Sequence, residues 1–206
     1  MKNQKECNEK VVAMCSSEHN SNFVDILNTH QKYNIIYADP PWAYLWGKGK
    51  EGGRFSPEKH YPTMSTDEIC EMKDTIKKIA DKNCALLMWA TMPCLPDAIK
   101  VIEEWGFKYK TCAFTWVKTK KDGDPLAGMG SYTKSNAEIC LLAMRGHIKS
   151  ADKTVRQIIM SQRQGHSVKP FETRDRIVKL FGDLPRIELF ARQKVDGWDC
   201  WGNEVA

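Results

Sequence analysis

The sequence has 206 residues, 42% of them hydrophobic, and a chain of this kind can bury the core of one compact domain. Lys and Arg number 31 against 26 Asp and Glu, and the formal net charge of +5 permits a polyanionic partner without requiring one. None of the 8 cysteines forms a C-x-x-C pair, which argues against a zinc site or a disulfide framework and favours a reducing cytoplasm. The longest apolar stretch, near residues 84–90, is too short for a bilayer, so no membrane association is expected.

The chain is expected to begin with a flexible lead-in over residues 1–22, which are polar and have no hydrophobic period. A single domain is expected over residues 23–206. Its first strand is predicted over 33–38 and ends where two prolines follow Asp39, because a strand cannot continue through them. Residues 46–54 are rich in Gly and Lys and lack an apolar period, so they are expected to form a long loop.

A helix is expected behind Ser65 and Glu68, which have the capping-box spacing, because apolar residues recur there at helical intervals. A second polar loop is expected over 119–135. The same kinds of pattern predict helices over 96–105 and 170–181, and strands over 84–90, 109–118, 137–144, 155–160 and 186–191. Strands that alternate with helices predict an α/β fold with a mostly parallel sheet and helices on both faces.

The tetrapeptide Asp39-Pro40-Pro41-Trp42 lies where ligands bind in such sheets, beyond the carboxyl end of a strand. It can be a rigid proline turn with an anchoring tryptophan, although these four residues rarely occur together by chance. Its chemistry suits an adenine amine, a weak nucleophile whose lone pair is delocalised into the ring. The Asp39 carboxylate and the Pro40 carbonyl can each accept one amine hydrogen, and the prolines hold both acceptors in place. The Trp42 ring offers a face on which a flipped base can stack.

Further blocks follow this tetrapeptide in the order of a known family. They are HYPTMS at 60–65, LLMW at 86–89, WGF at 105–107, TWVK at 115–118, AEICL at 137–141, RG at 145–146, KP at 169–170, IELFAR at 187–192, GW at 197–198 and WGNE at 201–204. With the tetrapeptide they cover about residues 33 to 204. The sequence resembles the N(6)-adenine methyltransferases related to the catalytic subunit of the eukaryotic mRNA adenosine methyltransferase (MT-A type), in a small prokaryotic or phage-like form.

The resemblance implies a Rossmann-like methyltransferase fold in circularly permuted motif order, with the catalytic block ahead of the cofactor block. It implies S-adenosyl-L-methionine as the cofactor and a catalytic role for the tetrapeptide 39–42. The cofactor-binding residues that it implies are Asp39, Lys169 at the cofactor's carboxylate end, Glu188 at the end of the cofactor-side strand, and Arg192, Asn203 and Glu204 at its ribose. Ala191 and Arg192 stand where many nucleotide-binding sheets have a glycine-rich turn.

Four residues are expected to bind the substrate: Tyr61, Trp116, Lys118 and Glu138. Trp116 lies within an apolar strand, where core packing is the favoured alternative to base stacking. Lys118 borders the expected groove and can contact phosphate or simply be solvated. A carboxylate in a strand, such as Glu138, favours a pocket because an unpaired buried charge is costly. No metal is expected, because no His–Cys or His–carboxylate ligand spacing occurs.

The function expected from the resemblance is transfer of a methyl group to the N(6) amine of adenine in DNA. DNA is preferred because a compact chain with no appended zinc finger or target-recognition domain looks like the prokaryotic type. RNA adenosine remains an alternative, as do a non-catalytic nucleic-acid-binding subunit on the same fold and a methyltransferase for protein or small-molecule amines. The sequence leaves open the recognition site, and whether the chain forms a homodimer or works with a partner subunit.

Overall fold

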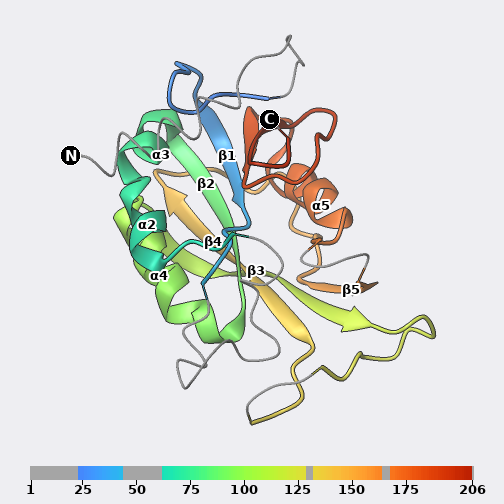
Figure 1. The fold of residues 1–206 in the computed structure, drawn as a ribbon. Helices are drawn as coiled ribbons and strands as arrows, with labels where there is room; N and C mark the ends of the chain where they lie inside the picture. Colours follow the sequence, from blue (N-terminus) through green and yellow to red (C-terminus); the bar gives the residue numbers. More distant parts are fainter. Residues whose placement is uncertain (1–22, 44–61, 129–131, 164–167, 206) are drawn as a thin grey trace, which may run out of the picture.

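The computed structural model in Figure 1 describes residues 23–43, 62–128, 132–163 and 168–205. Their centre is a seven-stranded sheet in the order β5-β3-β4-β2-β1-β6-β7. The strands are β1 (Tyr33–Ala38), β2 (Ala80–Ala90), β3 (Lys108–Thr119), β4 (Ala137–Arg145), β5 (Ile158–Gln162), β6 (Arg186–Leu189) and β7 (Asp199–Trp201). The expected lead-in over 1–22 and the expected loop over 46–54 lie outside the described residues.

The sheet is mostly parallel, as expected, and one strand is reversed. β1 runs parallel to β2 and β6, β6 runs parallel to β7, and β3 runs parallel to β5. β4 is antiparallel to both of its neighbours, β2 and β3. Because no helix lies between β3 and β4 in the described part of the chain, the chain returns directly beside β3, and such a return gives antiparallel pairing.

Helices cover both faces of the sheet, as predicted (Figure 1). One face packs against α2 (Thr66–Glu71), α3 (Lys73–Ile79) and α4 (Leu95–Glu104), with the short 3-10 turn η2 (Met92–Cys94) before α4. The opposite face packs against α5 (Glu172–Phe181). Alternate residues of β1 point to opposite faces of the sheet. Ile36 packs on the face covered by α2, α3 and α4, and Ile35 and Tyr37 pack on the face covered by α5.

The helix expected behind Ser65 is divided into α2 and α3, which meet at Met72. The capping box is present: the Glu68 amide donates to the Ser65 hydroxyl, and the Ser65 amide donates to the Glu68 carboxylate at 2.7 Å. Ile69 and Ile76 are both fully buried, so the helical spacing of apolar residues continues across the break. Periodicity alone therefore predicts the buried face correctly and misses the interruption.

Strand boundaries differ from the prediction in the middle of the sheet as well as at its ends. β1 matches its predicted span, and β2 begins at Ala80, four residues earlier than expected. The sequence does not predict β7, because its 3 residues are too few to show alternation. It is held by parallel pairing with β6 and brings the residues after Trp201 close to the end of β6. No helix in the described ranges combines the length and apolar character needed to cross a membrane.

Candidate active site

The tetrapeptide lies at the carboxyl edge of the sheet, between the ends of the two parallel neighbours of β1. The Asp39 amide donates to the Leu189 carbonyl at 3.4 Å, so Asp39 continues directly from β1 beside the end of β6. On the other side, the Trp42 indole donates to the Trp89 carbonyl of β2 at 3.0 Å. The Trp42 amide donates to the Pro40 carbonyl at 2.9 Å, which closes a tight turn. Both flanking strands therefore hold the tetrapeptide.

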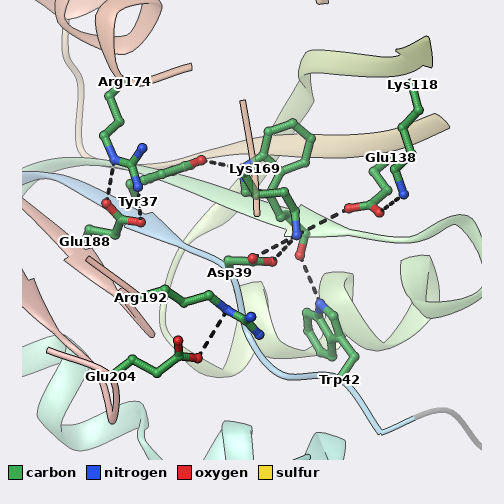
Figure 2. A network of polar contacts seen from close by, with 11 residues as sticks. Tyr37, Asp39, Trp42, Lys118, Glu138, Lys169, Arg174, Glu188, Arg192 and Glu204 are labelled. Carbon is green, nitrogen blue, oxygen red and sulfur yellow. Dashed lines mark hydrogen bonds and ion pairs between the residues drawn. The ribbon is translucent and has the colours of Figure 1, made fainter. Parts of the chain in front are cut away.

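Four side chains of alternating charge form a chain of ion pairs at this edge (Figure 2). The Lys169 ammonium lies 2.7 and 2.8 Å from the two oxygens of Asp39 and 3.3 Å from Glu138. The second oxygen of Glu138 pairs with Lys118. Lys169 precedes α5 and lies 130 residues from Asp39, while Glu138 and Lys118 come from β4 and β3. We call this set, Asp39–Lys169–Glu138–Lys118, the charge chain.

Burial and pairing act in opposite directions on the acids of the charge chain. Burial raises the pKa of Asp39, and Lys169 offsets only part of this rise. Burial also works to raise the pKa of Glu138, but Lys169 and Lys118 outweigh it, and the pKa falls below its ordinary value. Burial disfavours the charged form of Lys169, yet Asp39 and Glu138 together raise its pKa above the usual range. Lys169 is therefore a cation at neutral pH, and the charge on Asp39 depends on it.

A hollow of about 40 Å³ opens beside the charge chain. It is lined by Asp39, Pro40, Trp42, Trp89, Ala90, Thr91, Glu138 and Lys169. Pockets that enclose a drug-sized ligand hold roughly 300 Å³ or more. Lys169 lies between the two carboxylates, so a base can enter only if Lys169 or its neighbours move.

The expected cofactor-binding residues gather at the adjacent end of β6 (Figure 2). Arg192 and Glu204 form an ion pair at 3.6 Å, and Arg192 is close enough to lower the pKa of Asp39. Asn203 is exposed in the same turn as Glu204. Glu188 is 6% exposed, one residue before the end of β6. The structure thus brings together segments that lie on both sides of β7.

The turn after β6 replaces a glycine-rich loop with a strained residue. Phe190 has a φ of 60°, in the left-handed region that aromatic residues rarely occupy. Opposite it, a Cβ on Gly202 would lie 2.3 Å from the Ala191 carbonyl oxygen, so only glycine fits there. The Ala191 amide donates to the Trp201 carbonyl at 2.9 Å, which ties the two turns together. This close approach holds Arg192 beside Glu204.

The four residues expected to bind the substrate differ in where they lie relative to the site. Tyr61 lies outside the described residues. Lys118 and Glu138 face each other as part of the charge chain. A substrate-binding role for Trp116 stays a prediction. Its side chain is 2% exposed, packs in the core with α5, and donates its indole hydrogen to the Ser161 carbonyl at 3.1 Å. This burial favours core packing, the alternative that its place in an apolar strand already indicated.

Arg174 and Tyr37, which the sequence did not single out, lie next to the expected cofactor-binding residue Glu188. The Arg174 guanidinium of α5 donates to both oxygens of Glu188 at 2.7 Å. The same guanidinium lies 5.7 Å from the Tyr37 ring centre, and the Tyr37 hydroxyl accepts a hydrogen bond from the Trp89 indole at 2.6 Å. The sequence does carry a signal for Arg174. This residue lies at helical spacing from Ile177 and Phe181, on the buried face of α5, where an apolar residue is expected.

The fold and the site together define an α/β domain of the kind found in enzymes. Asp39, Lys169 and the turn formed by residues 39–42 lie at the carboxyl edge of its parallel strands. The MT-A70 family model matches residues 33–204, and the chain belongs to that family. No group of three or more His, Cys, Asp or Glu in the described ranges could hold a metal ion.

Curated relatives agree with this family. The chain is 35% identical to the type II methyltransferase M.MunI of a Mycoplasma species over 85% of this chain and 78% of that protein. It is 26% identical to the N6-methyladenosine RNA methyltransferase MTA1 of Pyricularia oryzae, over 87% of this chain and 49% of that protein. It is also 26% identical to the human N(6)-adenine-specific methyltransferase METTL4, over 87% of this chain and 39% of that protein. The chain thus spans most of the first relative and half or less of the other two.

Proposed function

We propose that the protein is an S-adenosylmethionine-dependent methyltransferase that modifies the N(6) amine of adenine in DNA. The observation that carries the proposal is the position of Asp39. Its carboxylate lies at the carboxyl edge of β1, in contact with Lys169 and beside the two turns that carry Arg192 and Glu204. An amine acceptor and a set of expected cofactor-binding side chains therefore meet at one edge of the sheet.

The residues at this edge fit the cofactor that MT-A70 methyltransferases generally use. Lys169 is a cation that can pair with the cofactor's carboxylate, and Arg192, Asn203 and Glu204 provide hydrogen-bonding groups for ribose hydroxyls. Glu188 adds a carboxylate near the place of the cofactor's positive charge. When bound, the cofactor supplies a methyl group on a sulfonium that a nucleophile can attack.

The chain's own contribution is to prepare the adenine amine. In the proposed mechanism Asp39 and the Pro40 carbonyl each accept one amine hydrogen, which localises the nitrogen lone pair and directs it toward the methyl group. A carboxylate has about four acceptor sites, so Asp39 can hold one amine hydrogen while Lys169 still occupies others. Trp42 lines the same hollow and can stack on the base.

Lys169 is the residue that must move in this proposal. It fills the space between Asp39 and Glu138 and is the proposed partner of the cofactor's carboxylate. A shift of the ammonium toward that carboxylate would release part of Asp39 for the amine and enlarge the hollow. Asp39 and Glu138 raise the pKa of Lys169 in the present geometry, and the cofactor's carboxylate would supply a negative partner when the ammonium shifts.

DNA is favoured over RNA as the substrate by the degree of identity. The chain is 35% identical to a type II methyltransferase and 26% identical to an RNA methyltransferase, and it spans 78% of the first and 49% of the second. The loop after β3 carries Lys120 and Lys121 close in sequence to Lys118 of the charge chain, where phosphate can be contacted. We infer a cytoplasmic enzyme, acting alone, as a homodimer, or with a partner subunit.

Parallel methyl-transfer assays test the proposal. Duplex DNA, RNA of the same sequence and a mixed protein substrate would be incubated with radiolabelled S-adenosylmethionine, and the nucleosides would be identified by mass spectrometry. The expected product is N(6)-methyldeoxyadenosine. Label found only in RNA would support the alternative substrate, and label found only in protein would reject nucleic acid altogether. If isothermal titration detected no cofactor binding, the non-catalytic binding subunit would be the better interpretation.

A further inference from the structure

The buried ion pair between α5 and β6 is a second charged system that the proposed mechanism does not use. Arg174 is 7% exposed and Glu188 is 6% exposed. Nε of Arg174 contacts one oxygen of Glu188 and Nη2 contacts the other, each at 2.7 Å, so the two planar groups meet as a fork. We call this pair the Arg174–Glu188 fork.

Stability alone is a weak reason for such a pair. Replacing a buried ion pair by apolar residues of similar size is often neutral or stabilising, because the desolvation of two charges offsets their attraction. Here the helical stripe of α5 already offers apolar neighbours, Ile177 and Phe181, against the same layer of the core. One nitrogen of the guanidinium, Nη1, is buried and has no hydrogen-bond partner within the described ranges, which adds to the cost.

The position of the fork relates it to the active site. Glu188 pairs with Tyr37 across β6 and β1, so Glu188, Tyr37 and Asp39 project from the same face of the sheet. Figure 2 shows Arg174 above Glu188, with Tyr37 between this pair and Lys169. The Arg174 guanidinium lies against the Tyr37 ring, and Tyr37 accepts the hydrogen of Trp89. Trp89 in turn lies under the Lys169 ammonium, 5.7 Å from ring centre to nitrogen.

The fork does not use every acceptor position of Glu188, a residue that is 6% exposed. Each carboxylate oxygen has two acceptor positions, and Arg174 takes one on each oxygen. The remaining acceptors are fixed in the plane that the guanidinium defines. Burial raises the pKa of Glu188 even with Arg174 in place, and loss of the guanidinium would raise that pKa further and favour the neutral form.

We propose that Arg174 is a positioning residue for the cofactor, which fixes the Glu188 carboxylate as an oriented anion at the end of β6. This inference rests on the proposed function, since it assigns a further residue to the same site. Arg174 acts through Glu188, with no cofactor contact of its own. It also braces the Tyr37–Trp89 layer on which Lys169 lies.

Arg174→Met tests the proposal by keeping side-chain length and removing the fork. The double variant Arg174→Met/Glu188→Gln also removes the charge that the single variant leaves unpaired. The matched control is Arg176→Met, because Arg176 lies on the same helix and also pairs with a glutamate, Glu172, at 2.9 Å, while its other bonds go to the carbonyls near β5. Cofactor affinity would be measured by isothermal titration, and folding by thermal melting.

We expect Arg174→Met to weaken cofactor binding about tenfold or more, the cost of losing a charge-assisted hydrogen bond, with a smaller effect on kcat. The double variant should recover the melting temperature without recovering cofactor affinity, and Arg176→Met should bind the cofactor like the wild type. The inference is overturned if Arg174→Met binds normally, if the double variant recovers affinity together with stability, or if Arg176→Met loses affinity equally. A wild-type protein that does not bind the cofactor overturns the proposed function itself. Should Arg174→Met fail to fold, Arg174→Lys keeps the positive charge beside Glu188 while losing the two-point fork, and wild-type cofactor affinity in that variant overturns the inference.

Discussion

Two buried charge systems lie at the same edge of the sheet, and they are built differently. In the charge chain, Lys169 divides its ammonium between two acids, at 2.7 Å from Asp39 and 3.3 Å from Glu138. In the Arg174–Glu188 fork, one cation meets one anion with both hydrogen bonds at 2.7 Å. The charge chain borders a hollow of about 40 Å³, and Arg174 of the fork lines a separate hollow of about 500 Å³, although Arg174 and Glu188 are only 7% and 6% exposed.

This contrast in construction indicates what each system can do. An ammonium is a point charge on a flexible stem, so it can change partners at little geometric cost. A guanidinium is a rigid planar group that matches one carboxylate, and a rotation that breaks one of its two hydrogen bonds breaks the other as well. We therefore expect the charge chain to rearrange when ligands enter and the fork to stay unchanged. Four further measurements can refute or refine this distinction.

The largest effect is expected from Asp39→Ala. Loss of a preorganised acceptor of the adenine amine should lower kcat/KM by at least about 100-fold, while the fold remains intact because Lys169 keeps Glu138 as a partner. Methyl transfer to duplex DNA and circular dichroism would be measured together. Asp67→Ala is the control, because Asp67 is an exposed acid that pairs with Lys100 on the surface. Near wild-type turnover in Asp39→Ala would remove Asp39 from the mechanism.

The next effect concerns stability, through Lys169→Met. This variant leaves two buried carboxylates without their shared cation, which should cost about 3 kcal/mol of unfolding free energy. Urea denaturation would measure the loss. Adding Asp39→Asn should restore part of it, because Asp39 is the carboxylate that loses its ion pair, whereas Glu138 keeps Lys118. An unchanged denaturation midpoint in Lys169→Met would mean that the charge chain does not hold the site together.

The third effect is a pH dependence with a definite sign. Asp39 must be ionised to accept an amine hydrogen, and burial raises its pKa above the ordinary value near 3.8. The acid limb of the kcat/KM profile should therefore lie above the pH expected for a free aspartate, and Lys169→Met should move it higher still. An acid limb at the ordinary aspartate pKa would contradict this picture.

The smallest effect is expected outside both buried systems, in the loop after β3. Replacing Lys120 and Lys121 by Ala should weaken DNA binding a few-fold and reduce the slope of log affinity against log salt by about 1 for each phosphate that is no longer neutralised. Fluorescence anisotropy over a range of salt concentrations would measure it. Equal salt slopes in the variant and the wild type would show that this loop does not bind the DNA backbone. The kcat at saturating DNA should not change.

Much of the fold can be predicted from the sequence, because the end of a strand or the start of a helix depends on a few neighbouring residues. The span of β1 follows from its β-prone residues and from the prolines that end it, and the capping box marks the start of α2. The burial of Trp116 is the favoured alternative for an aromatic residue in an apolar strand. In contrast, β7 is 3 residues long and is held by pairing with β6 and by a bridge between Cys200 and Phe23, so no pattern within it can reveal it.

The order of the elements, the place of the tetrapeptide after a strand, and the family can all be read from the amino-acid sequence. They depend on backbone geometry over a few neighbouring residues or on motifs that follow one another in order. Three features required the folded molecule: Lys169 meets Asp39 across 130 residues, β4 is reversed, and Arg174 faces Glu188. These features depend on which strands become neighbours and on which helix face turns inward, and the packing of the whole core determines both.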